Sequence, residues 1–387
     1  MTLTIRQDVT YHLVPWQGSD FNRVRDAWDY LATVDLQAPV FNYREWFELG
    51  CEASALSLWG VLLIEKADRP VAVFPLRKRS PWSWEVASFF GNGDLQVLID
   101  PLYEEMAWHE LAAWIAHTPQ VGYFSLGAVE QAARVELLVE ACRQHGLFPH
   151  VKRCAATDVW APLTATWEAF EQHIGRAAAK DLRRAERRMN DYYPEQTMEF
   201  LTDPEACREA LAELMVLYRQ RWGHRDLRCC FNDTSNVLFY QRAVDWAVRR
   251  GYGMISVLRV NGKPVALETL FRTSRRGTLY MHICARDAAM LPNRFSPGIV
   301  EAMHVFRRAI AEEMTSVNLG VLAMPYKMLF GGVEYPRWEV AVARSPLHQC
   351  ALPALDRGLH IAHRLPVHTG YHLRKLWDRS RREVATP

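Results

Sequence analysis

The chain has 387 residues, about the length of two ordinary domains. Hydrophobic residues make up 49% and charged residues 23%, which is typical of a globular protein and excludes a fibrous or disordered one. The net charge of +2 excludes binding of nucleic acid through overall charge, so any basic function has to be local. The 8 cysteines form no C-x-x-C pair, which favours reduced thiols over a disulfide framework or a zinc site.

Residues 1–16 lack the charged start and apolar core of a signal peptide. No apolar run approaches the ~18 residues that a membrane-spanning helix needs. We therefore expect a cytoplasmic protein without a transmembrane segment.

Hydrophobic periodicity and turn residues predict a first half of mixed strands and helices. Its centre is an antiparallel meander, in which a hairpin is followed by a third strand. The predicted strands are residues 11–16, 58–65, 70–77, 85–90, 121–126 and 157–163, and the predicted helices are residues 21–31, 43–51, 104–116 and 131–145.

The second half repeats this order. Asn261-Gly262 separates two strand-like runs and is a strong signal for a tight hairpin turn. The predicted strands are residues 198–201, 253–260, 264–271, 279–284, 317–319 and 338–343, and the predicted helices are residues 204–222, 237–250 and a long one that starts at 297. We expect an α/β (α+β) protein with two tandem domains, each a mixed, largely antiparallel sheet flanked by helices.

The repeat sets the predicted domain boundaries. Residues 1–165 form the N-terminal domain, residues 166–195 a basic linker helix, residues 196–345 the C-terminal domain and residues 346–387 a basic tail. A Ser-Pro-Gly loop at 296–298 occurs in the second half and not at the matching place in the first. A cofactor is therefore expected in the second domain.

The sequence Arg294-Phe295-Ser296-Pro297-Gly298 opens the long helix of the second half. Pro297 suits the first helical position and Ser296 the N-cap. A helix that starts from a loop offers free backbone N–H groups to an anion. Together with the strands before and after it, the helix makes a βαβ unit. We interpret its first turn as a cradle for a pyrophosphate group; the alternative is an ordinary helix that begins with proline.

The predicted helix at 174–189 carries a basic stripe on one side and an apolar stripe on the other. The stripe consists of Arg176, Lys180, Arg183, Arg184, Arg187 and Arg188. One interpretation is a linker helix with a solvated face. The other is a guide for an anionic partner, such as an anionic acceptor, a carrier protein or tRNA.

The tail at 359–382 is also basic, which would allow peripheral contact with the inner face of the membrane or with an acidic partner. It contains His360, His363, His368 and His372 at metal-like spacing. They lack a carboxylate or cysteine partner, so we expect no metal site.

Several short motifs resemble a known family when they are taken in order. They are Arg221-Trp222, Asp287, Ser296-Pro297-Gly298, Gly320 and Tyr326-Lys327, with Phe90-Gly91 and Asp94 in the first half. In this order they resemble the GNAT-like acyl-CoA N-acyltransferases, in the bacterial branch first associated with cellulose biosynthesis and related to the Fem-type peptidoglycan aminoacyltransferases. The resemblance covers residues 41–342. The chain departs from the usual GNAT pyrophosphate signature Q/R-x-x-G-x-G/A, because residues 294–298 stand in its place.

The resemblance implies tandem GNAT-like domains and transfer of an acyl group from coenzyme A to an amine or a sugar hydroxyl. Acetyl-CoA or another acyl-CoA would be the co-substrate, bound in the second domain by Lys327 and by Arg294, Phe295, Ser296, Pro297 and Gly298. The partner would be a small-molecule or glycan acceptor, not DNA.

Acyl transfer to an amine benefits from a base, because an amine with a pKa of ~10.4 is protonated at neutral pH. Glu268, in a meander strand, and Asp287, just after the next strand, are the candidates; the alternatives are a solvated strand face and a turn-forming aspartate. Tyr326 is the candidate acid for the departing thiolate. His282 is expected to be a core histidine.

The leading hypothesis is thus an acyl-CoA-dependent acyltransferase, with a role in cell-envelope or polysaccharide metabolism. A Fem-like aminoacyltransferase that uses aminoacyl-tRNA and a catalytically silent tandem scaffold are the alternatives. The sequence identifies neither the acceptor, nor the acyl chain, nor the oligomeric state.

Overall fold

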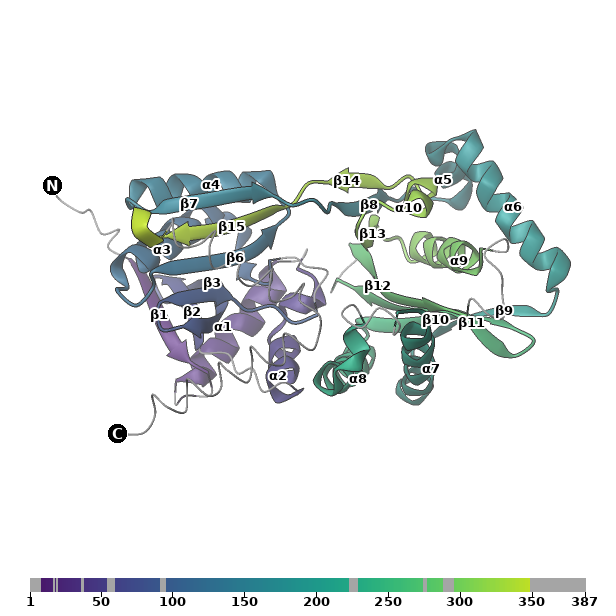
Figure 1. The fold of residues 1–387 in the computed structure, drawn as a ribbon, viewed down its shortest axis with the longest axis horizontal. Helices are drawn as coiled ribbons and strands as arrows, with labels where there is room; N and C mark the ends of the chain where they lie inside the picture. The colour runs from purple at the N-terminus through teal and green to yellow at the C-terminus, as the bar shows by residue number, and fades with distance from the viewer. Residues whose placement is uncertain are drawn as a thin grey trace, which may run out of the picture.

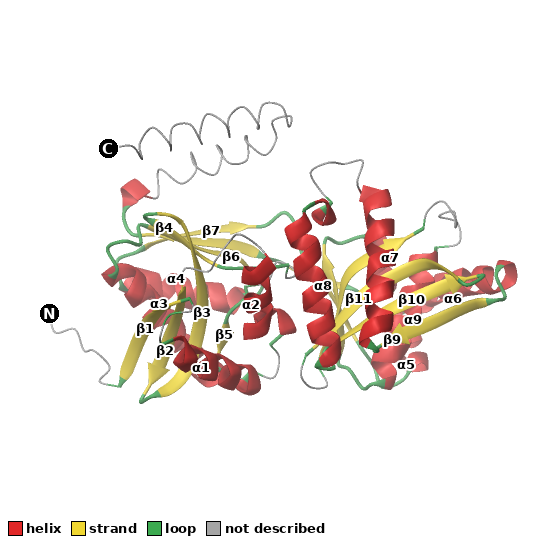
Figure 2. Cartoon of the chain, turned by 90° about the horizontal axis from the view of Figure 1, so that it is seen from below, coloured by secondary structure: helices red, strands yellow, loops and turns green. Residues whose placement is uncertain are grey.

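The computed structural model describes residues 8–16, 18, 20–35, 38–53, 60–90, 95–222, 229–273, 277–287 and 296–348. They form two mixed sheets that lie side by side along the long axis of the molecule (Figure 1). Helices cover both faces of each sheet (Figure 2). The predicted fold class is therefore confirmed. Within the described ranges, no helix is long and apolar enough to cross a membrane.

The first sheet has the strand order β1-β2-β3-β4-β6-β15-β7, with β5 paired to β3. Only β4 and β6 are parallel; the other pairs are antiparallel. Its strands are β1 (Val9–Pro15), β2 (Gly60–Lys66), β3 (Arg69–Ser80), β4 (Ser83–Val86), β5 (Leu98–Ile99), β6 (Tyr123–Val129), β7 (Phe148–Arg153) and β15 (Trp338–Ala343). Its helices are α1 (Phe21–Val34), α2 (Arg44–Ala53), α3 (Glu104–His117) and α4 (Ala132–Gln144), with short 3-10 turns at Val40–Asn42 and Pro101–Tyr103.

The second sheet has the strand order β14-β8-β13-β12-β11-β10-β9. Again one pair, β12 and β13, is parallel. Its strands are β8 (Asp158–Pro162), β9 (Gln196–Leu201), β10 (Gly253–Val260), β11 (Lys263–Arg272), β12 (Thr278–Arg286), β13 (Ser316–Val321) and β14 (Val333–Tyr335). Its helices are α5 (Trp167–Ile174), α6 (Arg176–Tyr192), α7 (Pro204–Trp222), α8 (Thr234–Arg249), α9 (Pro297–Ala311) and α10 (Pro325–Leu329), with a 3-10 turn at Cys230–Asn232.

The two sheets exchange a strand near the end of each half. The first half supplies β8, which pairs with β13 and β14 of the second sheet. The second half supplies β15, which lies between β6 and β7 of the first sheet. The sequence patterns predicted both strands but placed each in its own half. A boundary at 165 or 345 therefore does not separate the strands of the two sheets, although the repeated order of the elements is present.

The meander of the second sheet forms where its turn residues predict it. Asn261 and Gly262 have φ angles of 50° and 75°, the left-handed conformations that a type I′ hairpin turn requires. They join β10 to β11 in antiparallel register. β11 in turn pairs antiparallel with β12 along its length. Apolar residues on one face of these strands pack under α7 and α8, and those on the other face pack under α9.

Side chains from both halves share one apolar cluster between the sheets. Phe41 and Trp46 of the first half pack against Phe271 of β11. His282 of β12 stacks on Phe41, and its Nε2 lies 2.8 Å from the carbonyl oxygen of Phe90. Its Nδ1 lies 2.7 Å from the hydroxyl of Tyr240. Burial lowers the pKa of His282 to about 4, so the ring is neutral. The prediction of a core histidine is confirmed.

Candidate active site

The parallel strands β12 and β13 separate after a short paired stretch. Their register runs from Thr278 and Ser316 to Tyr280 and Asn318 and ends there, although both strands continue. Beyond that point no described residue of β12 pairs with β13. β12 stays attached to β11 up to Arg286, so β12 and β13 separate toward their carboxyl ends. We call this opening the β12–β13 split.

Gly320 and Lys327 form the β13 side of the split. Gly320 has a φ angle of 73°, a conformation that favours glycine, and its N–H donates to the side-chain oxygen of Asn318. The ammonium group of Lys327 donates to the carbonyl oxygens of Gly320 and Val321, at 3.0 and 2.8 Å. Burial lowers the pKa of Lys327 to about 8. Two of the three N–H donors of its ammonium group thus bind carbonyl oxygens of the protein itself. The contact of Lys327 with the cofactor remains a prediction.

Glu268 is buried on the β11 side of the split, where only 5% of it is exposed. The solvated strand face that the sequence left open is therefore excluded. No side chain or backbone group of the described residues donates a hydrogen bond to its carboxyl group. The pKa of Glu268 is raised well above its ordinary value, mainly by burial and to a smaller extent by the charge of Glu301. The charge of Lys327 opposes this shift. An unpaired buried carboxyl group with a raised pKa is suited to proton transfer near neutral pH.

A second buried carboxyl group comes from helix α9. Glu301 is 2% exposed and accepts a hydrogen bond of 2.5 Å from the hydroxyl of Ser256 on β10. Burial raises the pKa of Glu301 to about 8, and the Ser256 hydrogen bond opposes the shift. Glu301 and Glu268 influence each other, because two neighbouring carboxylates do not ionise together easily. The split therefore contains two neighbouring buried carboxyl groups, and their surroundings favour the protonated form of each.

Tyr326 and Cys284 complete the polar lining. The pKa of Tyr326 is raised above its ordinary value, mainly by burial and to a smaller extent by the charges of Cys284 and Glu268, so its hydroxyl stays protonated. Cys284 is the register partner of Glu268. Its side chain reaches solvent, yet desolvation raises its pKa to about 12. Both observations fit a thiol in a recess that water enters and protein surrounds.

Helix α9 starts beside this recess with Ser296 at the N-cap and Pro297 at the first helical position, as predicted. Ser296 has left-handed backbone angles, and its side chain makes no capping hydrogen bond. Its carbonyl oxygen accepts from the N–H groups of Ile299 and Val300. A Cβ placed on Gly298 would meet no heavy atom within 4 Å, so the helix opens onto free space there. Arg294 and Phe295 lie outside the described residues.

The structure thus brings together Glu268, Tyr326 and Lys327 of the predicted site residues. Asp287 follows the last residue of β12, and its N–H donates to the carbonyl oxygen of Val265. The charges that shift the pKa of Glu268 are those of Glu301 and Lys327, and Asp287 is not among them. The roles predicted for these residues and for Ser296, Pro297 and Gly298 remain predictions.

Sequence patterns missed Glu301, Ser256 and Cys284. The signal for Glu301 was a carboxylate at helical spacing between Pro297 and Val305, a row that is otherwise apolar and buried. Such an interruption points to a buried polar group that needs a partner. Ser256 and Cys284 carried no comparable signal, because small polar residues and cysteines are ordinary in strands.

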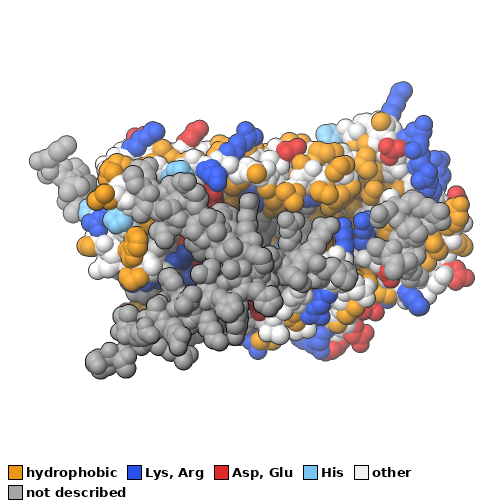
Figure 3. Space-filling view, viewed as in Figure 1, with side chains coloured by type: hydrophobic (Ala, Val, Ile, Leu, Met, Phe, Trp, Pro, Cys, Tyr) orange, Lys and Arg blue, Asp and Glu red, His pale blue; other side chains and the backbone are white. Residues whose placement is uncertain are grey.

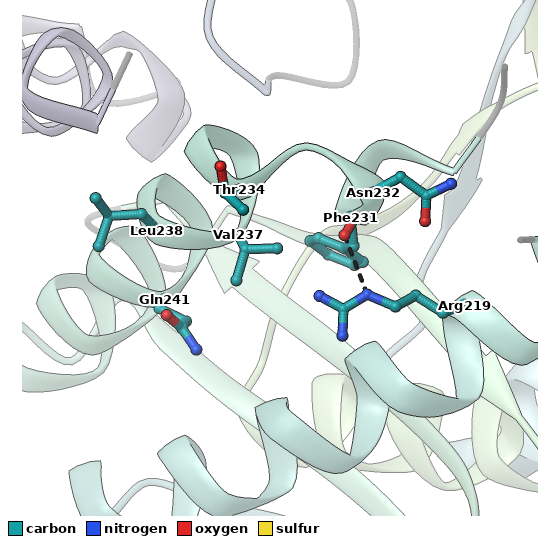
Figure 4. A pocket seen from close by; sticks show the side chains of 7 residues that line it. All are labelled: Arg219, Phe231, Asn232, Thr234, Val237, Leu238 and Gln241. Atoms are coloured by element: carbon teal, nitrogen blue, oxygen red, sulfur yellow. Dashed lines mark hydrogen bonds between the residues drawn. The ribbon is translucent and has the colours of Figure 1, made fainter. Parts of the chain in front are cut away.

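A surface cavity of about 510 Å³ lies between α7 and α8, away from the split. Figure 4 shows Arg219 reaching across it, and its Nε donates to the carbonyl oxygen of Phe231 at 3.0 Å. The remaining lining residues are Asn232, Thr234, Val237, Leu238 and Gln241. This cavity contains none of the buried titratable groups, so its lining offers no group for acid–base chemistry.

The basic stripe predicted at 174–189 lies on helix α6, and its six cationic side chains are exposed. Lys and Arg side chains gather at the α6 end of the molecule in the space-filling view (Figure 3). Leu182 and Met189 on the opposite side of the helix are buried. Glu186 pairs with Arg307 of α9, which attaches α6 to the helix that flanks the split. The basic tail at 359–382 and its histidines lie outside the described residues.

Comparison with known proteins agrees with this arrangement. Residues 176–328 match the family model of the acetyltransferase (GNAT) domain, a span that contains α6, the meander and the split. No curated protein matches the chain in sequence.

Three solved structures share the fold of both halves. FemX is 11% identical with a TM-score of 0.58, over 84% of this chain and 98% of that one. A conserved protein of unknown function from Bacteroides thetaiotaomicron is 13% identical with a TM-score of 0.55, over 86% and 100%. The C-terminal domain of a candidate lysylphosphatidylglycerol synthetase from Agrobacterium fabrum is 14% identical with a TM-score of 0.54, over 88% and 97%. At these identities the likeness shows the fold alone. The split and its buried carboxyl pair thus lie within residues 176–328, the span that is similar to the acetyltransferase (GNAT) domain.

Proposed function

We propose that the protein transfers an acetyl or other acyl group from an acyl-CoA to an amine or sugar hydroxyl, and that the β12–β13 split is its active site. The observation that carries this proposal is the end of the β12–β13 register at Tyr280 and Asn318. Past that point the facing edges of two strands are available to an extended ligand, as in strand addition. The amide-containing arm of coenzyme A is such a ligand.

The groups around the split suit the reaction. The acceptor nitrogen attacks the thioester carbonyl carbon, the C–S bond breaks, and the thiolate of coenzyme A leaves. Glu268 takes the proton that the nitrogen loses, which its raised pKa favours. Tyr326 stays protonated and donates a hydrogen bond to the sulfur as charge develops there. Asp287 is the alternative base.

We place the pyrophosphate of coenzyme A at the start of α9. The residues proposed to contact it are Arg294, Phe295, Ser296, Pro297 and Gly298, with Lys327 nearer the thioester. Gly298 supports this placement, because the space around it is open and the positive end of a helix attracts anions. An acyl-CoA donor also implies a cytoplasmic enzyme, with the basic tail and α6 available for peripheral contact with the membrane.

A substitution at Gly298 tests this placement with a matched control. Because a Cβ fits there, Gly298→Asp adds a negative charge without a clash, and Gly298→Asn adds the same volume without the charge. We expect Gly298→Asp to weaken acetyl-CoA binding at least ~tenfold and Gly298→Asn to change it less than ~threefold, measured by calorimetry. Arg294→Ala should weaken binding as well. Equal affinities for the Asp and Asn variants would place the pyrophosphate elsewhere.

A Fem-like aminoacyltransferase is the second candidate, and the exposed basic stripe on α6 favours it. The same titration distinguishes the donors. Acetyl-CoA should stabilise the protein against unfolding by about 2.7 kcal/mol at a hundredfold excess over its Kd. A tRNA donor predicts that aminoacyl-tRNA binds in a salt-sensitive way and that the triple variant Arg183→Gln, Arg184→Gln, Arg187→Gln loses this binding. That result, together with no effect of any acyl-CoA, would establish the tRNA donor. If neither donor binds and no turnover is detected, the third candidate, a catalytically silent scaffold, is favoured.

A further inference from the structure

Two arginine side chains at the mouth of the split pair with no carboxylate in the part of the chain that the structure describes. Arg286 is the last residue of β12, and Arg221 lies in the last turn of α7, a helix that packs against β12. Among the described residues neither guanidinium makes an ion pair, whereas arginines elsewhere in the second half, such as Arg208, Arg259 and Arg307, pair with glutamates. The Nε of Arg286 is buried and has no hydrogen-bond partner.

This arrangement is unfavourable unless an anion joins it. Burial and the neighbouring charge of Arg221 lower the pKa of Arg286. A buried donor without an acceptor costs free energy, and two neighbouring cations repel each other. A carboxylate or phosphate between the two guanidinium groups would supply acceptors to both, in the bidentate geometry that arginine prefers.

The arginine pair lies close to the proposed base. Cys284 is the register partner of Glu268, and Arg286 follows two residues along the same face of β12. Two residues of a strand span about 6.6 Å. The charge of Arg221 also acts on Cys284 and Tyr326, which puts it at the same recess. An anion held here is therefore within the length of a small molecule from Glu268.

We propose that Arg221 and Arg286 bind a carboxylate or phosphate of the acceptor, so that the acceptor is a small amine with an anionic group a few bonds from its nitrogen. The anion would hold the amine between Glu268 and the thioester. Its role as acceptor rests on the proposed function, whereas the anion site itself does not. The tests below separate these two claims.

Alkylation of Cys284 tests the anion site without catalysis. Iodoacetate carries a carboxylate, and iodoacetamide is its neutral counterpart; in both reactions the sulfur forms a bond to the methylene carbon, iodide leaves and the thiol proton goes to solvent. We expect the iodoacetate-to-iodoacetamide rate ratio at Cys284, measured by peptide mass spectrometry, to exceed that at the half-buried Cys154 by at least ~tenfold. In Arg286→Gln and Arg221→Gln the two ratios should become equal. A ratio at Cys284 that these variants leave unchanged would overturn the site.

Pairs of acceptors, each with one anionic and one neutral amine, test whether the anion site binds the acceptor. With acetyl-CoA as donor, kcat/KM for phosphoethanolamine should exceed that for ethanolamine, and that for 4-aminobutyrate should exceed that for 4-aminobutanamide, each by at least ~tenfold. Arg286→Gln should abolish both preferences, and Arg208→Gln, which removes a paired arginine from the same helix, should keep them. The larger of the two preferences identifies phosphate or carboxylate as the anion. Equal kcat/KM values within each pair in the wild type would overturn the proposal. Weakened acetyl-CoA binding in Arg286→Gln, with both preferences intact, would also overturn it and would assign the arginines to the donor.

If acetyl-CoA does not bind but Cys284 still shows the charge-dependent ratio, the proposed function fails and the anion site stands. If acetyl-CoA binds and is turned over but the ratio is absent, the function stands and the anion site fails.

Discussion

Glu268→Gln is expected to lower kcat/KM for acyl transfer by about 10²–10⁴, the usual contribution of a general base. Glutamine keeps the shape of the side chain and removes its ability to accept a proton. The affinity for acetyl-CoA, measured by calorimetry, should stay within about twofold, because the proposal gives Glu268 a part in proton transfer and none in donor binding. The matched control is Glu199→Gln, which removes a half-exposed carboxylate that pairs with Arg259 on β10 of the same sheet.

The pH dependence of kcat/KM tests the same residue. A base acts only when it is deprotonated, and burial and Glu301 favour its protonated form, so kcat/KM should rise with pH over a limb well above pH 4.5. Glu301→Gln removes the neighbouring charge and should move this limb to lower pH. The groups that face Glu268 also include Lys327, Cys284 and Tyr326, and Lys327 lowers the pKa of Glu268. A pH limb that survives in Glu268→Gln would assign the base to another group, with Asp287 as the next candidate.

Arg337→Met is expected to destabilise the fold by about 3–5 kcal/mol, because it leaves a buried carboxylate without its cation. Arg337 lies between β14 and β15, and its Nε is 3.1 Å from Oδ2 of Asp158 on β8. Asp158 is fully buried and Arg337 is 6% exposed. These two atoms do not form a hydrogen bond, so the contact stabilises the fold through its opposite charges. The pair joins β8 to the segment just before β15, next to both strands that the halves exchange.

Denaturant unfolding measures this loss, and a neighbouring pair provides the control. Lys152 of β7 and Glu339 of β15 form an ion pair, but they are 64% and 58% exposed and 4.0 Å apart. Glu339→Gln should change the free energy of unfolding by less than about 0.5 kcal/mol. Adding Asp158→Asn to Arg337→Met should recover part of the lost stability, since the uncompensated charge is then gone. A double variant that is as unstable as the sum of both single variants would contradict a pairwise interaction.

Local patterns in the sequence were sufficient to predict where most helices and strands form, but not which strands pair in each sheet. Asn261-Gly262 fixes the β10–β11 hairpin, because its backbone angles are accessible to few other residues. The start of α9 at Ser296 and Pro297 follows in the same way from helix-capping preferences. The exchange of β8 and β15 was not predictable, because an apolar strand pattern specifies a buried face and not a partner strand.

The same distinction applies to the candidate site: local patterns identified some of its residues, whereas tertiary contacts determine the surroundings of those residues. Motif order located Tyr326 and Lys327, and a carboxylate within an apolar strand pattern located Glu268. The burial of Glu268 depends on α9 lying across β11, which is a tertiary contact. Glu301 was missed because the helix was identified by its apolar positions alone. The contacts of Lys327 with β13 were missed because they depend on the left-handed backbone at Gly320 and the sharp return of the chain into α10.

The most direct test of the central claim is an experimental structure of the protein with acetyl-CoA bound. We predict that the amide-containing arm lies in the β12–β13 split, with the acetyl group next to Glu268 and the pyrophosphate at the start of α9. Binding of acetyl-CoA in the cavity between α7 and α8, or against the first sheet, would contradict the account.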